Sequence, residues 1–146
     1  RSARLGWLVR NTSAMDSRAD LFAAYESTVV TTTNPESLER VSAEEACRTR
    51  QLGAVVITAW NPGFERPARE SNGAANERLL DDIAATGLTC WDARGESPDG
   101  EFHEDGFLVW GMAVSEGIRL GVKYGQFAVF DYRADGGRVL VECVAA

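Results

Sequence analysis

The chain has 146 residues, 45% of them hydrophobic, which is enough to bury one core and too few to predict two. Its formal net charge is −7, from 22 acidic and 15 basic residues, and its single lysine is Lys123. Because nucleic-acid binding needs a concentrated basic face, this balance argues against a nucleic-acid partner.

The cysteines and the hydropathy pattern predict the redox environment of the chain and whether it spans a membrane. Cys47, Cys90 and Cys143 are widely separated and form no CxxC or Cys/His pattern, which predicts reduced thiols and a cytoplasmic location. No apolar run approaches the roughly 18 residues of a membrane span, so we expect a soluble protein without a membrane partner. His103 is the one histidine, and we expect neither a metal site nor a cofactor.

Met15 directly precedes a predicted helix start. We therefore interpret residues 1–14 as an extension or expression remnant and residues 15–146 as a single α+β domain. The helix is predicted by the helical spacing of Leu21, Phe22, Ala24 and Tyr25.

The next two segments are predicted to have different secondary structures. Residues 28–33 are β-branched throughout and are followed by Asn34-Pro35, which predicts a strand. Residues 35–52 are charged and contain alanine, and they fit one broken helix or two short ones.

The strongest strand signal is the apolar run that begins at Ala54 and ends in Asn61-Pro62-Gly63. Its β-branched residues are apolar on both faces, which is typical of a central strand that is covered on two sides. A polar loop follows at residues 63–70, and Ser71 or Asn72 is expected to cap a helix that ends near Gly87.

The second half of the chain alternates strands and loops with one more helix. Residues 88–91 predict a short strand, residues 92–105 a long mobile loop, and residues 107–112 another strand. In the helix predicted for residues 115–124, Gly117 and Gly121 recur at four-residue spacing, followed by Gly125. We favour close packing on the sheet as the reason, and the alternative is approach of a ligand to the exposed backbone.

The chain ends in a predicted hairpin of residues 127–132 and 138–143, joined by Asp135-Gly136-Gly137. From residue 54 onward the order of elements is therefore strand, helix, strand, strand, helix, strand. This order predicts a ferredoxin-like split β-α-β sandwich, with an added N-terminal helix and strand and a C-terminal hairpin strand, and with helices mostly on one face.

Several short motifs resemble a known bacterial family. They are Leu21-x-x-Ala24-Tyr25-x-x-Thr28, Ile57-Thr-Ala-Trp-Asn-Pro62, Asn72 ahead of a helix, Glu104-Asp105-Gly106-Phe107-Leu108-Val109 and Gly125-Gln126-x-Ala128-Val129. Together they resemble the family catalogued as domain of unknown function 3293, over residues 16–132. The family's usual Trp-x-Glu-Glu-Ser is replaced here by Phe102-x-Glu104-Asp105-Gly106, so the serine hydroxyl is absent. The resemblance implies domain boundaries and brings no assigned activity.

Four polar residues at the ends of predicted strands and helices are candidates for ligand binding: Asn61, Asn72, Glu104 and Gln126. Each also has a structural interpretation, because Asn61 can cap its own turn, Glu104 can be a solvated loop residue, and Gln126 can satisfy backbone groups at a helix end. Glu104 is also a candidate general base, and at most one of Glu104 and Asp105 points into a given site because neighbouring strand residues face opposite ways.

Other reactive residue types have plainer interpretations. His103 is expected to be exposed and idle in an acidic loop, and Cys90 is interpreted as a buried thiol rather than an activated nucleophile. Tyr25 and Thr28 are interpreted as packing and strand residues.

Two classes of function fit these residues, and the sequence contains no signature that decides whether the protein is an enzyme. In the first, the domain binds a small polar ligand, for example a nucleotide-like one, at the strand ends. In the second, it is a regulatory or interaction module without chemistry that contacts a protein partner through its aromatic residues, which are Trp60, Phe64, Trp91 and Phe102.

Overall fold

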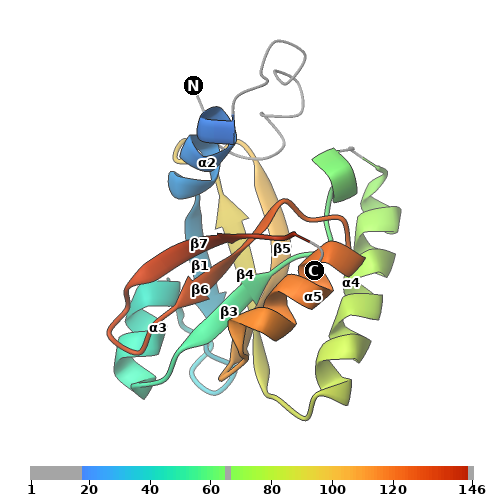
Figure 1. The fold of residues 1–146 in the computed structure, drawn as a ribbon. Helices are drawn as coiled ribbons and strands as arrows, with labels where there is room; N and C mark the ends of the chain where they lie inside the picture. The colour runs from blue at the N-terminus through green and yellow to red at the C-terminus, as the bar shows by residue number, and fades with distance from the viewer. Residues whose placement is uncertain (1–17, 65–66, 145–146) are drawn as a thin grey trace.

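The computed structural model describes residues 18–64 and 67–144, which form an α+β domain (Figure 1). This part of the chain has α-helices α2 (Arg18–Glu26), α3 (Ala43–Arg50), α4 (Arg69–Ala85) and α5 (Val114–Lys123), with a 3-10 turn η2 (Pro62–Phe64). Its strands are β1 (Val29–Thr33), β2 (Arg40–Ser42), β3 (Ala54–Ile57), β4 (Cys90–Glu96), β5 (His103–Trp110), β6 (Ala128–Tyr132) and β7 (Arg138–Glu142). The segment predicted to be an extension, residues 1–14, lies outside the described residues.

All seven strands form one curled antiparallel sheet in the order β2-β1-β4-β5-β3-β6-β7. β3 pairs with β5 on one side and β6 on the other, so that Val55 lies opposite both Val109 and Asp131. Each of its four residues is buried. The prediction of a central strand is therefore confirmed, because a run that is apolar on both faces pairs on both edges and is covered on both faces.

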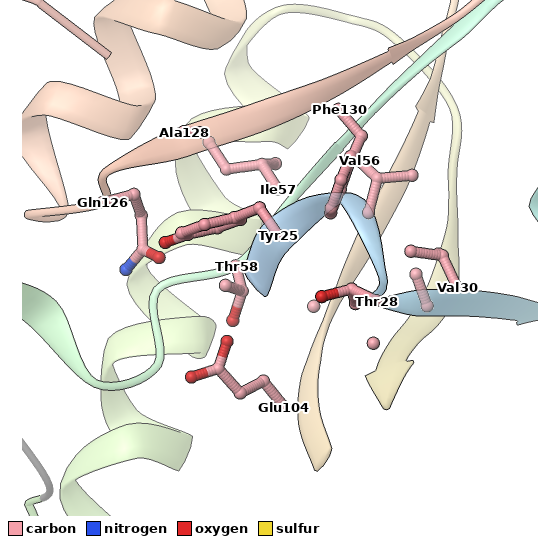
Figure 2. Close-up of a pocket in the computed structure, with 13 residues that line it drawn as sticks. Tyr25, Thr28, Val30, Val56, Ile57, Thr58, Glu104, Gln126, Ala128 and Phe130 are labelled. Carbon is pink, nitrogen blue, oxygen red and sulfur yellow. The ribbon is translucent and has the colours of Figure 1, made fainter. Parts of the chain in front are cut away.

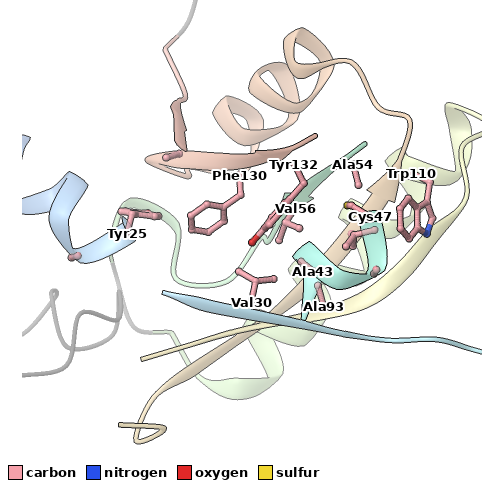
Figure 3. Close-up of a cluster of buried hydrophobic side chains, with 14 residues drawn as sticks. Tyr25, Val30, Ala43, Cys47, Ala54, Val56, Ala93, Trp110, Phe130 and Tyr132 are labelled. Carbon is pink, nitrogen blue, oxygen red and sulfur yellow. The ribbon is translucent and has the colours of Figure 1, made fainter. Parts of the chain in front are cut away.

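Helices cover both faces of this sheet, so the expectation that they lie mostly on one face is wrong. On the first face, α2 contributes Tyr25 and α3 contributes Cys47 to a cluster that also contains Phe130 and Tyr132 (Figure 3). On the second face, Leu79 and Ile83 of α4 and Leu120 of α5 pack in a separate cluster. β3 supplies Val56 to the first cluster and Val55 to the second, which places this strand at the centre of the fold.

The glycines of α5 mark where that helix touches the sheet. A Cβ added at Gly117 would lie 2.9 Å from Val55 Cγ1, and one at Gly121 would overlap Cys143 Sγ. These positions therefore need glycine so that the helix can approach the sheet, which is the packing interpretation that the four-residue spacing favoured.

The long loop predicted for residues 92–105 is wrong, because most of it belongs to the hairpin of β4 and β5. On one face of the hairpin, Arg94 lies directly opposite Asp105, and the Arg94 Nε to Asp105 Oδ1 distance is 3.0 Å. The small residue Ala93 points to the buried cluster on the other face. Charged residues that pair across the strands, together with small side chains, made this segment resemble a loop.

The segment 35–52 contains one helix and a strand, instead of only helical pieces. β2 pairs antiparallel with β1, and α3 begins directly after it. Ser42 caps α3, because its side-chain oxygen accepts a hydrogen bond from the Glu45 backbone N–H at 3.1 Å.

Candidate functional site

The chain leaves the sheet directly after β3 in a bend held by side chains from neighbouring elements. Thr58 Oγ1 donates to the Asp105 carbonyl at 2.6 Å and accepts from the Trp60 N–H at 3.0 Å. Asn76 of α4 accepts from the Ala59 N–H at 3.0 Å and donates to the Asp105 carbonyl at 2.8 Å. These bonds replace the ladder that β3 no longer makes with β5, so the backbone groups of the bend stay paired.

Three of the four predicted site residues meet at the end of this bend. Asn61 Nδ2 donates to Glu104 Oε2 at 2.6 Å, and Asn72 Nδ2 donates to Asn61 Oδ1 at 3.1 Å. Asn72 Oδ1 also accepts from the Asn61 backbone N–H at 3.0 Å. All three residues are buried, with Glu104 only 7% exposed. We call Asn61, Asn72 and Glu104 the carboxylate relay.

The backbone explains why asparagine occupies position 61. Its φ is +51°, in the left-handed region, which asparagine tolerates better than most residues. The prediction that Asn72 or Ser71 caps α4 is wrong, because the helix begins at Arg69 with Ala68 at the cap position. Asn72 therefore lies inside the first turn, where its side chain is available to Asn61.

Gln126, the fourth predicted residue, holds the same bend from the side of β6. Its Nε2 donates to the Trp60 carbonyl at 3.0 Å and to the Tyr124 carbonyl at 3.1 Å. These bonds fit the structural interpretation of Gln126, because Tyr124 directly follows helix α5 and Trp60 lies in the bend after β3. Gln126 is 7% exposed and, like Glu104, lines a pocket.

That pocket is a cavity of about 50 Å³ on the first face of the sheet (Figure 2). Its polar side chains are Glu104, Gln126, Tyr25, Thr28 and Thr58. Its other lining residues are apolar or lack a side chain: Val30, Val56, Ile57, Ala93, Gly95, Gly106, Ala128 and Phe130. Asn61 and Asn72 do not line it, so they act on the pocket through Glu104.

Glu104 and Asp105 point in opposite directions, as the alternation of strand residues predicts. Glu104 lines the pocket, whereas Asp105 forms its ion pair with Arg94 and faces a second, open hollow. Only Glu104 of these two carboxylates belongs to the pocket.

Tyr25 and Thr28 belong to the pocket as well, although the sequence suggested only packing and strand roles for them. Tyr25 is 4% exposed, and burial, followed by the charge of Glu104, raises the pKa of its hydroxyl well above the usual value. The phenol therefore stays protonated at neutral pH. The sequence indicated these two residues only through the motif Leu21-x-x-Ala24-Tyr25-x-x-Thr28, which places two hydroxyl residues at the end of one helix.

His103 and Trp60 lie on the other side of the carboxylate relay. Their ring centroids are 5.6 Å apart, and both line a hollow that also reaches Asn61 and Asn72. The expectation that His103 is exposed in a loop is wrong, because it is the half-buried first residue of β5.

The thiols are not activated. Burial, and then the charge of Asp92, raises the pKa of the Cys90 thiol, and burial raises the pKa values of Cys47 and Cys143 to about 11. None of the three forms a disulfide. Among residues 18–64 and 67–144, no group of three or more His, Cys, Asp or Glu side chains is placed to hold a metal ion.

Within the part of the chain that the structure describes, no helix has both the length and the apolarity that a membrane span requires.

The fold and this site define an α+β domain with a buried carboxylate beside a pocket, where its central strand ends. The family model described as "Protein of unknown function (DUF3293)" matches residues 57–129, and the chain belongs to this family. The match includes all four predicted site residues and excludes Tyr25 and Thr28. No curated protein and no solved structure matches the chain.

Proposed function

We propose that the domain binds a small polar ligand in the pocket lined by Glu104 and Gln126. The observation that supports this most is the burial of the Glu104 carboxylate beside an otherwise largely apolar cavity. Removing a carboxylate from water costs several kcal/mol. A buried carboxylate that lines a cavity is therefore a candidate ligand-binding group, and the hydrogen bond from Asn61 fixes its position.

The carboxylate relay supports the same proposal. It fixes Glu104 through Asn61, whose backbone adopts a conformation that costs roughly 1–3 kcal/mol for most residues. Strain of this kind is common at binding sites, where a side chain is held ready for its ligand. Asn61 and Asn72 are thus positioning residues for Glu104.

The size of the pocket limits what enters it. A cavity of about 50 Å³ is far smaller than the roughly 300–1,000 Å³ of sites that enclose a drug-sized ligand. A whole nucleotide or metabolite does not fit inside, so one end of a larger ligand enters and the rest lies at the mouth. For a nucleotide-like ligand, that end is an edge of the base.

A thermal-shift screen against nucleosides, nucleotides, amines and amino acids tests the proposal. A ligand at a hundred times its dissociation constant adds about 2.7 kcal/mol to the free energy of unfolding. Ala128→Leu, which fills the pocket wall, is expected to abolish the shift, and Val122→Leu on the exposed side of α5 is expected to preserve it. The proposal fails if no compound stabilises the wild type, or if Ala128→Leu keeps the full shift.

The aromatic residues give the alternative of an interaction module less support. Trp91 packs edge-on against Trp110 at 5.0 Å between ring centroids, under the Arg50 guanidinium. Trp60 lies instead beside His103. Phe102 lines the same hollow as Trp60, so the described aromatic side chains of this alternative occupy two separate places. The Phe64 side chain lies outside the described part.

We also infer that the segment from β3 to β6 is a ferredoxin-like core. The elements follow one another as strand, helix, strand, strand, helix, strand, and the strands are ordered β4-β5-β3-β6 in the sheet. α4 and α5 pack on the same face. These features support a split β-α-β arrangement, to which α2, β1, β2, α3 and β7 are additions.

A further inference from the structure

A second hollow, of about 310 Å³, lies on the opposite face of the sheet from the proposed ligand pocket. Ala93 and Gly106 line both spaces, because the backbone of β4 and β5 separates them. Its volume is at the lower end of the roughly 300–1,000 Å³ of small-molecule sites. Four charged residues line this second hollow: Arg40, Asp92, Arg94 and Asp105.

The register of the sheet sets how far apart two of these charges stand. Arg40 of β2 lies directly opposite Thr33 of β1. Thr33 follows the Thr32–Ala93 pair of β1 and β4, so it stands beside Asp92. Because adjacent strands are about 4.8 Å apart, the backbones of Arg40 and Asp92 are separated by roughly 10 Å, with Thr33 between them. The strands therefore hold a positive and a negative side chain at the two ends of one row.

The other two charges neutralise each other. Arg94 Nε lies 3.0 Å from Asp105 Oδ1 in an ion pair across β4 and β5. Arg40 and Asp92 form an ion pair neither with each other nor with another residue in the described part of the chain, and both are exposed. The second hollow thus contains one guanidinium and one carboxylate that are left for a ligand.

From this arrangement we propose that the second hollow binds a zwitterion of amino-acid size, with its carboxylate on Arg40 and its ammonium group on Asp92. A guanidinium binds a carboxylate through two parallel N–H bonds, and an ammonium group has three hydrogens to donate. Each charged bond is about 2.8 Å long, so a separation of roughly 10 Å leaves room for one α-amino acid between the two side chains.

The pair of opposite charges also determines which ligands are disfavoured. An anion that pairs with Arg40 is repelled by Asp92, and a cation that pairs with Asp92 is repelled by Arg40. Phe107, which is 8% exposed, lies opposite Asp92 in the sheet and gives an apolar contact for a hydrophobic side chain of the ligand. The site is separate from the pocket of the proposed function, so either proposal can fail without the other.

Three probes that share one side chain measure the charge preference: L-leucine, N-acetyl-L-leucine and L-leucinamide. The first is a zwitterion, the second an anion and the third a cation. Two-dimensional 15N NMR spectra of the full chain follow the amides of Thr33, Asp92 and Phe107, which line the second hollow. We expect leucine to shift these amides in a saturable way, and each of the other two probes to bind at least about fivefold more weakly.

Two substitutions are expected to change the order of the probes as well as their affinity. Arg40→Gln should weaken leucine binding at least about fivefold and make leucinamide bind more tightly than N-acetyl-leucine. Asp92→Asn should weaken leucine binding similarly and make N-acetyl-leucine the better of the two. Because both residues are exposed, we expect both variants to fold, which their spectra verify. Arg133→Gln, an exposed arginine after β6, is the control and should change binding less than about twofold.

The results decide between a zwitterion site and its alternatives. If leucine does not shift the amides of the second hollow, or if all three probes bind equally, the inference is wrong. It is also wrong if Arg40→Gln and Asp92→Asn leave the order of the probes as it is in the wild type. If the probes shift only amides of the first pocket, such as that of Ala128, the inference fails while the proposed function gains support.

Discussion

Asn72→Ala is the substitution that most directly tests how the carboxylate relay is held together. It removes two hydrogen bonds to one residue: the acceptor of the Asn61 N–H at 3.0 Å and the donor to Asn61 Oδ1 at 3.1 Å. Asn61 and Asn72 are 9% and 5% exposed, so both orphaned groups of Asn61 would be left largely away from water.

The magnitude follows from the cost of an unsatisfied buried group. Each costs roughly 1–3 kcal/mol, which gives about 2–6 kcal/mol for the pair. The hollow that reaches Asn61 and Asn72 lets water approach after truncation and reduces this range. We therefore expect Asn72→Ala to lower the free energy of unfolding by about 2–4 kcal/mol.

Urea denaturation followed by tryptophan fluorescence measures this loss, with the slope of the transition checked for constancy. Ser71→Ala is the matched control, because Ser71 is an exposed neighbour in the same helical turn, and it is expected to change stability by less than about 0.5 kcal/mol. If Asn72→Ala is no more destabilising than this control, the relay does not support Glu104, and the positioning role assigned to Asn61 and Asn72 is wrong.

Two further predictions concern the second face of the sheet. Gly121→Ala is expected to lower the free energy of unfolding by about 1–3 kcal/mol, because the added methyl group overlaps Cys143. In the double variant, Cys143→Ala is expected to remove most of this loss. If urea denaturation shows that the two losses are additive, the contact between these residues is contradicted. Tyr124→Phe is expected to raise the pKa of Asp82, measured by carboxyl 13C NMR, because Lys123 and then Tyr124 hold that pKa low through hydrogen bonds, the latter at 2.6 Å. A carboxyl group whose pKa is lowered in the folded state stabilises the fold above its unfolded-state pKa, and this stabilisation is lost as the pH falls through the folded-state pKa. Tyr124→Phe should therefore also reduce the loss of stability in acid. An unchanged pKa of Asp82 would contradict this prediction.

The central strand and the helices were predictable because their signals are local. The run from Ala54 to Ile57 is apolar on both faces, and the glycine spacing of α5 reflects packing on that strand. The β4–β5 hairpin was not predictable in the same way. Its charged residues are stabilised by a partner across the strand pair, as Arg94 is by Asp105, and such pairing depends on a register that a single sequence does not display.

The candidate site also contains some residues whose position the sequence could predict and others whose position depends on the tertiary fold. Glu104 and Gln126 stand next to apolar runs, so their position at the ends of strands could be inferred from the sequence. Tyr25 lies on α2, which packs over the sheet from elsewhere in the chain, and its place in the pocket depends on that docking. Asn76, which bridges Ala59 and Asp105, looked like an ordinary helix residue for the same reason.

The pocket itself follows from the early end of β3. Ile57 pairs with Phe107, but β5 continues for four further residues in the direction of His103, and the run into Asn61-Pro62 does not follow it. Proline lacks the N–H that a continued ladder would need, and the left-handed Asn61 turns the chain away. Glu104 of β5 and Gln126 ahead of β6 both line the pocket, together with Ile57 and Thr58 at the end of β3. Because Asn61 and Pro62 end the strand here, the same turn that stops β3 brings Asn61 to Glu104 at the pocket.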